Sequence, residues 1–143
     1  YAMLEVAPFP AAAPDDANGD GFPSYADAPN ASATGFGFQM GLLAETESGF
    51  SVGVSFKSAQ QFEDFEFDGV DESGAAKAMS FNLDYPRILS AGIGYSMDKL
   101  ELAADYRYID YANTDGFDTA GFDNTGAVTG FGWNSISVVA FGV

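Results

Sequence analysis

Cysteine and histidine are both absent from this sequence, and Lys and Arg together number only 5 of its 143 residues. Without thiols or imidazoles the chain has no disulfide, no thiolate metal site and no His-based acid–base or nucleophilic machinery. Its 21 Asp and Glu give a formal net charge of -16, which repels nucleic acids and anionic membrane surfaces. Nothing selects two of these carboxylates as a glycosidase pair. We therefore expect neither an enzyme nor a nucleic-acid partner.

Long apolar runs are missing too. No stretch approaches the roughly 18 uncharged apolar residues of a membrane helix, which excludes a helical membrane protein. The first ten residues, YAMLEVAPFP, have no basic segment followed by an apolar core and do not form a signal peptide. The lack of an initiator Met indicates a mature product or an excised fragment. The chain is instead rich in Phe (14), Tyr (7) and Gly (17), a mixture that favours strands and turns.

Alternation of apolar and polar residues predicts the strands, most clearly at residues 50–58 (FSVGVSFKS). In an extended strand its Phe and Val side chains lie on one side, and its Ser, Gly and Lys side chains on the other. Such a strand suits a soluble β-sandwich or the wall of a membrane barrel. Residues 36–44 are predicted to form an antiparallel hairpin with residues 50–58. Further strands are predicted at residues 79–85, 88–96, 100–108 and 133–143.

The lengths of the connections favour the barrel. Short connections (45–49 and 97–99) alternate with long ones (1–35, 59–77 and 110–133), and the strands have about the 9 to 11 residues of a tilted membrane strand. The polar face of residues 100–108 carries charges of both signs, which a wet lumen tolerates better than a sealed core. Aromatic residues gather near strand ends, as in aromatic girdles: Tyr85, Tyr95, Tyr106, Tyr108, Tyr111 and Trp133. We predict an all-β antiparallel meander, a section of a transmembrane outer-membrane β-barrel with long extracellular loops.

Two regions follow from this interpretation. Residues 1–35, rich in Pro, Ala and Asp, form an extracellular-type loop, and residues 36–143 form the strands and loops of an incomplete barrel. The loop contains a pattern similar to an EF-hand calcium loop, whose predicted ligands are Asp16, Asn18, Asp20, the carbonyl of Phe22, and Asp27 at position twelve. It departs from the motif in having Asp at position twelve, Pro23 after Gly21, and no flanking helices. The alternatives are a Ca²⁺ site, the one cofactor suggested by the sequence, and an acidic solvated loop.

Two cations and three aromatic residues are the candidate substrate contacts. Lys57 and Arg107 are predicted to face the lumen, where they either attract a substrate carboxylate or pair with acids such as Asp105 and Glu101. A second group is either a landing surface for a hydrophobic ligand at the outer mouth or a strand extension packed against loops: Phe62, Phe65 and Phe67.

Five segments resemble, in order, the long-chain fatty acid and aromatic hydrocarbon transporters of the bacterial outer membrane. They are TGFGFQMGL, SVGVSFKSAQQFEDFEF, LDYPRILSAGIGYS, LELAADYRYIDYANTDGF and VTGFGWNSISVVAFGV, which together span roughly residues 33–143. The resemblance implies passive uptake of hydrophobic small molecules through a larger barrel closed by an N-terminal plug. This chain resembles an internal section of that barrel.

The resemblance also implies partners. These are a hydrophobic ligand, outer-membrane lipid and, for the two unpaired sheet edges, either the remainder of a barrel or copies of the chain itself. The alternative from another class is a secreted, extracellular acidic protein that binds calcium and self-associates through its open edges into a structural fibre.

Overall fold

The structure, a computed structural model, describes residues 1–8 and 12–143. These residues form antiparallel sheets and a single turn of 3-10 helix (η2, Tyr111–Asn113), which confirms the prediction of an all-β antiparallel fold. The described part contains no closed barrel. The strands are β1 (Ala2–Val6), β2 (Ala31–Phe36), β3 (Gln39–Glu45), β4 (Phe50–Lys57), β5 (Gln61–Phe62), β6 (Phe65–Val70), β7 (Ala76–Phe81), β8 (Ile88–Met97), β9 (Leu100–Ile109), β10 (Gly121–Phe122), β11 (Val128–Gly130) and β12 (Ile136–Gly142).

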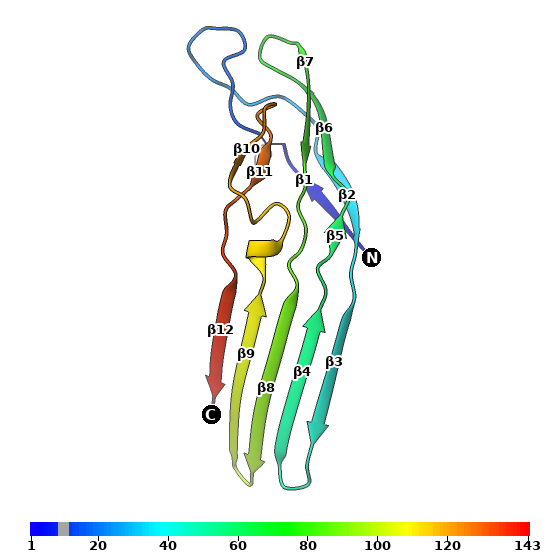
Figure 1. The fold of residues 1–143 in the computed structure, drawn as a ribbon, viewed down its shortest axis with the longest axis vertical. Coiled ribbons are helices and arrows are strands. Elements are labelled where there is room, and N and C mark those ends of the chain that lie inside the picture. Colours follow the sequence, from blue (N-terminus) through cyan, green and yellow to red (C-terminus); the bar gives the residue numbers. More distant parts are fainter. Residues whose placement is uncertain (9–11) are drawn as a thin grey trace.

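The largest sheet has five strands in the order β12-β9-β8-β4-β3, and every neighbouring pair is antiparallel (Figure 1). Paired residues of neighbouring strands face the same side of a sheet. The apolar sides of all five strands therefore lie on one face of the sheet. Val54 lies between Leu42 and Ala91, both apolar. Its neighbour Ser55 points to the other side. The predicted hairpin of residues 36–44 and 50–58 is confirmed as β3–β4.

Short connections join the strands at the lower end of this sheet (Figure 1). Residues 46–49 connect β3 to β4, and Gly49 ends that turn with φ 85°, a left-handed conformation that favours glycine. A Cβ at Gly49 would also overlap the carbonyl oxygen of Ser96 in the neighbouring strand. Asp98 and Lys99 connect β8 to β9, with Asp98 at φ 53°. The long connections all lie at the upper end, as the sequence predicted.

Above the five-stranded sheet the strands are interrupted at a common level and then continue in smaller sheets (Figure 1). These sheets are β1-β2-β5, β6-β7 and β10-β11. Gly37 and Phe38 separate β2 from β3, while the segment from 82 to 87, with Pro86 in it, separates β7 from β8. Proline has no N–H to give to a sheet, which explains why the pairing breaks there.

The hydrophobic core lies wholly in this upper part. Its buried members come from β2, β6, β7 and the loops, and none from the five-stranded sheet: Ala12, Ala31, Ala33, Phe65, Phe67, Met79, Phe81 and Ala127. The five-stranded sheet therefore leaves both of its faces uncovered by the described residues.

The predicted long loops contain more regular structure than expected. Residues 1–35 are not loop throughout, because β1 pairs with β2 along five residue pairs. Residues 59–77 hold β5 and β6, and residues 110–133 hold η2, β10 and β11. The prolines of the N-terminal segment that are described lie between β1 and β2 and leave that ladder intact. Residues 9–11 of the predicted loop lie outside the described residues.

Candidate functional site

One face of the five-stranded sheet, here called the apolar face, has no charged residue. It consists of Met40, Leu42, Ala44, Phe50, Val52, Val54, Phe56, Leu89, Ala91, Ile93, Tyr95, Met97, Leu100, Leu102, Ala104, Tyr106, Tyr108, Ser137, Val139 and Phe141. Leu42 is 77% exposed and Phe141 is 82% exposed. Water-soluble monomers rarely present an uninterrupted apolar surface of this extent.

The few polar atoms on the apolar face have partners. The hydroxyls of Tyr106 and Ser137 are 2.9 Å apart and share a hydrogen bond between β9 and β12. Tyr108 donates to the carboxylate of Asp110 at 3.3 Å, and the Tyr95 hydroxyl contacts the sulfur of Met97 at 3.6 Å. A face whose hydroxyls are satisfied within the protein needs no water beside it.

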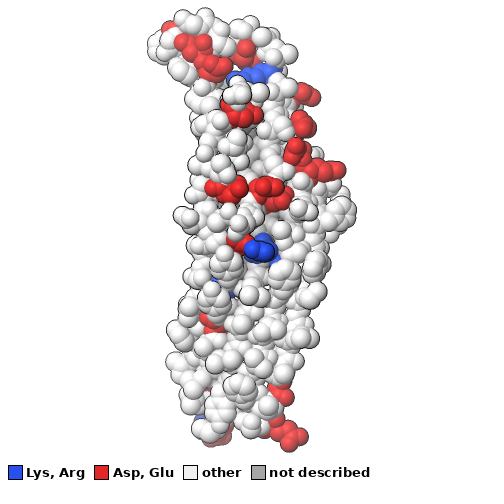
Figure 2. All heavy atoms as spheres, viewed as in Figure 1, with Lys and Arg blue, Asp and Glu red and all other residues white. Residues whose placement is uncertain are grey.

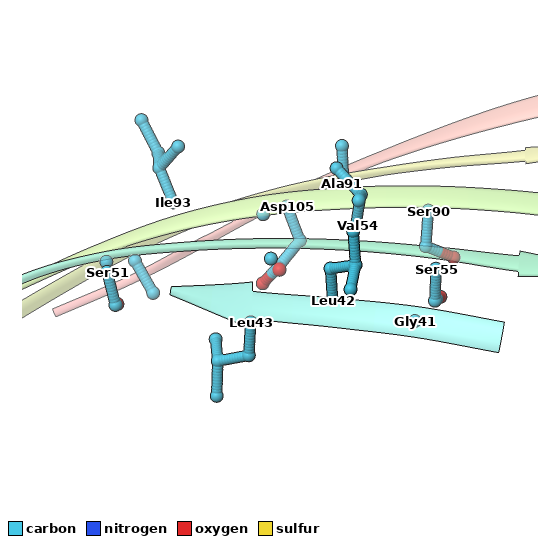
Figure 3. Close-up of a pocket in the computed structure, with 14 residues that line it drawn as sticks. Gly41, Leu42, Leu43, Ser51, Val54, Ser55, Ser90, Ala91, Ile93 and Asp105 are labelled. Atoms are coloured by element: carbon cyan, nitrogen blue, oxygen red, sulfur yellow. The ribbon is translucent and has the colours of Figure 1, made fainter. Parts of the chain in front are cut away.

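The opposite face, here called the small-residue face, is mixed: small, polar and charged residues lie beside five larger aliphatic ones, Leu43, Ile88, Ile109, Ile136 and Val138. It carries all the charged residues of the sheet and a floor of Gly and Ser: Gln39, Gly41, Leu43, Glu45, Ser51, Gly53, Ser55, Lys57, Ile88, Ser90, Gly92, Gly94, Ser96, Glu101, Ala103, Asp105, Arg107, Ile109, Ile136, Val138, Ala140 and Gly142. An open hollow of about 530 Å³ lies over this floor. Figure 3 shows Ser51, Asp105 and Ser90 pointing to the side opposite Ile93.

Asp105 reaches across the sheet floor from β9. Its Oδ1 lies so close over Gly92 of β8 that a Cβ at Gly92 would overlap it. Ser51 lies over Gly94 in the same way. The glycines therefore make room for polar side chains that lie flat, which keeps the hollow open.

Lys57 and Arg107 both lie on the small-residue face, as predicted. The Nζ of Lys57 sits 3.9 Å from the centre of the Tyr85 ring, a cation–π contact. Arg107 pairs in register with Ser90 and Val138. Neither cation forms an ion pair with a carboxylate within residues 1–8 and 12–143, so the predicted pairing with Asp105 or Glu101 is not seen there.

The three predicted phenylalanines do not form one exposed surface. Phe65 and Phe67 are 0% and 1% exposed, because β6 turns them into the core while Glu66 and Asp68 face outward. Phe62 is half-buried and packs against that core. The rings of Phe65 and Phe67 are thus inaccessible to a ligand, and the interpretation as packed strand residues describes them correctly.

The calcium-type loop is organised by its own hydrogen bonds and by a distant carboxylate. Within it, the backbone N–H of Gly21 donates to Asp16 Oδ2 at 3.0 Å, and that of Phe22 to Asp20 Oδ1 at 2.8 Å. Glu72, from the β6–β7 turn, accepts from the backbone N–H of Asn18 at 3.0 Å and the hydroxyl of Ser24 at 2.8 Å.

Position twelve of that loop lies elsewhere. The backbone of Asp27 pairs with Val70 of β6, and its side chain is exposed. The described residues include no group of three or more Asp or Glu placed to hold a metal ion. Calcium binding by Asp16, Asn18, Asp20, Phe22 and Asp27 stays a prediction.

A network around Asp110, at the upper end of β9, was missed by the sequence analysis. Asp110 is 1% exposed, and its carboxylate accepts hydrogen bonds from Arg87 Nε at 2.6 Å, Asn113 at 2.7 Å and Ser135 at 2.8 Å. Burial acts to raise the pKa of Asp110, but these hydrogen bonds outweigh it and hold the pKa below its usual value. The network joins the beginnings of β8 and β12 to the end of β9.

A second buried carboxylate lies where β7 gives way to β8. Asp84 is 8% exposed and accepts a hydrogen bond from the backbone N–H of Phe62 at 2.8 Å. Burial raises the pKa of Asp84, and the neighbouring carboxylates of Asp115 and Asp64 add to this. The boundary between the five-stranded sheet and the smaller sheets thus contains two buried carboxylates. The charged form of Asp110 is stabilised there, and the charged form of Asp84 is destabilised.

Aromatic rings gather at the same level, beside η2. Trp133 lies 5.2 Å from Tyr111 and 5.0 Å from Phe117 between ring centres, and Phe131 completes the group. Trp133 remains 51% exposed. Tyr111 and Trp133 were both among the predicted girdle residues.

Acidic side chains are most numerous in the upper half of the molecule in the view of Figure 2, and the fewer charged groups of the lower half include several at its lower end. No helix of the described residues has the length and apolarity to cross a bilayer. Comparison of the chain with models of known families, with curated proteins and with solved structures finds no match.

Proposed function

We propose that the five-stranded sheet is part of the wall of an outer-membrane β-barrel that lets hydrophobic small molecules diffuse inward. The observation that carries this proposal is the apolar face, which is uncovered across five strands, free of charge and has its hydroxyls paired. In such a barrel, the apolar face of the sheet contacts lipid on the outside, and the small-residue face lines a water-filled lumen. The uncharged band then lies in the bilayer, and the acidic upper part lies outside the cell.

The small-residue face supports the second half of the proposal. Its glycine floor and open hollow leave a smooth path along the wall, and Arg107 and Lys57 offer the only positive charges on that face. A long-chain fatty acid presents an apolar chain and a carboxylate to such a surface, whereas an aromatic hydrocarbon presents no charge. We place both among the ligands, with the cations contacting only the acid.

The test of membrane residence is partition of the intact chain between a detergent-rich phase and water. We expect the chain in the detergent phase. The alternative, an extracellular fibre assembled through the open edges of β3 and β12, predicts filaments that sediment from water without detergent. That result would contradict the proposal.

The test of the ligand uses the detergent-solubilised chain and the variant Arg107→Gln. We expect a long-chain fatty acid to bind several-fold more weakly to the variant, because a carboxylate loses its cation. Binding of an uncharged aromatic hydrocarbon should not change. Equal losses for both ligands would show that Arg107 shapes the wall and does not attract a carboxylate.

A further inference from the structure

A row of polar side chains borders the apolar face at its upper end. The backbone N–H of Asp110 donates to the carbonyl of Arg87 at 3.1 Å, which continues the register of β8 and β9 by one pair (Figure 1). Since side chains alternate along a strand, Arg87 and Asp110 lie on the same side as Leu89 and Tyr108, which belong to the apolar face. The hydrogen bond from the Tyr108 hydroxyl to Asp110 agrees with this placement.

Arg87 presents a cation at this border, while its acidic partner is hidden. The side chain of Arg87 is 57% exposed and that of Asp110 is 1% exposed. Nε and Nη2 of Arg87 lie 2.6 and 2.5 Å from Asp110 Oδ2. A guanidinium has further N–H groups, and those on Nη1 have no acceptor within residues 1–8 and 12–143. Arg87 is therefore held in position by one edge and open to an anion at the other.

Aromatic rings lie next to this cation. Tyr111 follows Asp110 directly, and Trp133 lies two residues before Ser135, whose hydroxyl donates to Asp110 at 2.8 Å. The rings of Trp133 and Tyr111 have their centres 5.2 Å apart, and Trp133 is 51% exposed. Tryptophan and tyrosine favour the headgroup level of a membrane, where one part of the ring is apolar and another meets water. The border of the apolar face thus suits contact with lipid headgroups.

The charge of the chain limits the kind of headgroup that fits. A net charge of -16 repels anionic surfaces at long range, so a diffuse attraction is excluded. The carboxylate of Asp110 beside Arg87 is buried and accepts hydrogen bonds from Arg87, Asn113, Ser135 and Tyr108. Attraction must therefore be a direct contact between one phosphate and the guanidinium, whose planar fork matches phosphate oxygens. A phosphomonoester offers three acceptor oxygens and more than one negative charge, which makes it the strongest partner of this kind.

We propose that Arg87, with Trp133 beside it, binds the phosphomonoester of a lipid headgroup in the outer leaflet. This inference rests on the proposed function, because it needs the apolar face in a bilayer and the acidic upper part outside. The acyl chains of that lipid lie along the apolar face beside Leu89, and its phosphate reaches Arg87. The site is separate from the hollow, since Lys57 and Arg107 lie on the opposite face.

The test uses Trp133, the one tryptophan of the chain, as the reporter. The full chain is folded into vesicles of brominated phosphatidylcholine, which quenches a tryptophan at the headgroup level. A second lipid without bromine relieves the quenching to the extent that it displaces phosphatidylcholine from Trp133, which gives its relative affinity. The second lipid is lipid A, a glycolipid with two phosphomonoesters, or its dephosphorylated form. A chelator removes divalent cations, so that carboxylates cannot bind phosphate through a metal ion.

Lipid A should be preferred over phosphatidylcholine by about tenfold, because its phosphate forms charge-assisted hydrogen bonds. Dephosphorylated lipid A should show no preference. Arg87→Gln should abolish the preference for lipid A. Lys99→Gln removes the same charge from the exposed β8–β9 turn, at the other end of the sheet, and should leave the preference unchanged. If Arg87→Gln does not fold, Arg87→Lys keeps a charge beside Asp110 without the planar fork and should show a weakened preference.

Several results would overturn the inference while leaving the proposed function intact. Equal affinity for lipid A and its dephosphorylated form, or for lipid A and phosphatidylglycerol, would show that no phosphomonoester is recognised. Equal losses in Arg87→Gln and Lys99→Gln would remove the role of Arg87. Loss of the preference in excess inorganic phosphate would assign the site to a free anion, and a chain that floats with vesicles without quenching of Trp133 would place Trp133 away from lipid. Failure of the chain to float with any vesicle would instead contradict the proposed function.

Discussion

At the scale of single residues, the boundary between the five-stranded sheet and the smaller sheets contains two buried carboxylates, and their surroundings shift the two pKa values in opposite directions. Asp110 is surrounded by donors from β8, η2 and the segment before β12, and Arg87 faces it at 2.5 Å. Asp84 has one backbone donor and two acidic neighbours. Removing each carboxylate should therefore have opposite effects on stability.

Asp110→Ala should lower the free energy of unfolding by about 3 kcal/mol, because several charge-assisted hydrogen bonds lose their common acceptor. The measurement is urea unfolding in vesicles. Glu47→Gln, in the exposed β3–β4 turn, is the control and should change the free energy by less than about 0.5 kcal/mol. Equal effects of the two variants would contradict the role given to Asp110.

The same carboxylate gives a pH dependence. The folded pKa of Asp110 is below its unfolded value of about 3.9, so its contribution is complete above that pH and is lost as the pH falls toward the folded pKa. Asp110→Asn should remove this part of the acid-induced loss of stability. Unfolding midpoints measured from pH 6 down to pH 2 test it, and parallel curves for variant and parent would argue against it.

Asp84→Asn should raise the unfolding midpoint at pH 7. The raised pKa means that stability falls as the pH rises from the unfolded value of about 3.9 through the folded one. Asparagine removes the charge and keeps an oxygen for the Phe62 N–H. The gain should vanish near pH 3, where Asp84 is protonated in both states, and a gain that persists there would point to packing instead.

The sequence alone predicted the face of the sheet on which some of these side chains lie, but not the buried network around Asp110. Lys57 and Arg107 were assigned to the correct face because alternation fixes the side on which a strand residue lies. Phe65 and Phe67 were ambiguous, because alternation does not say which side of an isolated hairpin faces a core. Asp110 gave no signal, because, besides the nearby Tyr108 and Asn113, its partners lie 23 residues earlier at Arg87 and 25 residues later at Ser135.

At the scale of elements, the β3–β4 turn depends on Gly49. Gly49→Ala should lower the free energy of unfolding by about 2 kcal/mol or more, because it adds an overlap with the Ser96 carbonyl to the strain of a positive φ. Gly74 has φ 80° with open space around it, so Gly74→Ala should cost only about 1 kcal/mol. Chemical unfolding of both variants measures the difference, and equal costs would contradict the close approach at Gly49.

The two faces of β4 permit a matched pair of substitutions at adjacent residues. Val54→Arg places a cation on the apolar face and should lower the free energy of unfolding in vesicles by about 2–4 kcal/mol. Ser55→Arg places it on the small-residue face and should change that free energy by about 0.5 kcal/mol or less. Folding titrations with urea in phosphatidylcholine vesicles compare them, and a larger loss for Ser55→Arg would reverse the assignment of the faces.

Long elements were predicted well, and short ones were not. β4, β8 and β9 have 8 to 10 residues with clear alternation, and each lies within two residues of its predicted bounds. β10 and β11 lie among Gly, Asp and Thr, where local preference favours turns. They form because the upper part folds into a core around Phe65, Phe67 and Phe81, a tertiary effect that composition does not show.

At the scale of the whole molecule, the structure divides into a lower sheet without a core and an upper part that holds all of the core. A bilayer would replace the core that the lower sheet lacks, since lipid covers an apolar face as another sheet would. The sequence predicted two different faces correctly. It also predicted two unpaired edges, but not that the edge strands β3 and β12 run in the same direction, because direction depends on the count and order of strands.

The most direct measurement is contact with lipid at residues 54 and 55. Val54→Cys and Ser55→Cys, each labelled with an environment-sensitive fluorophore, are folded into vesicles that contain brominated phospholipid. We predict strong quenching for the label at residue 54, on the apolar face, and weak quenching at residue 55, on the small-residue face. Equal quenching of the two labels, or none at residue 54, would contradict the membrane wall.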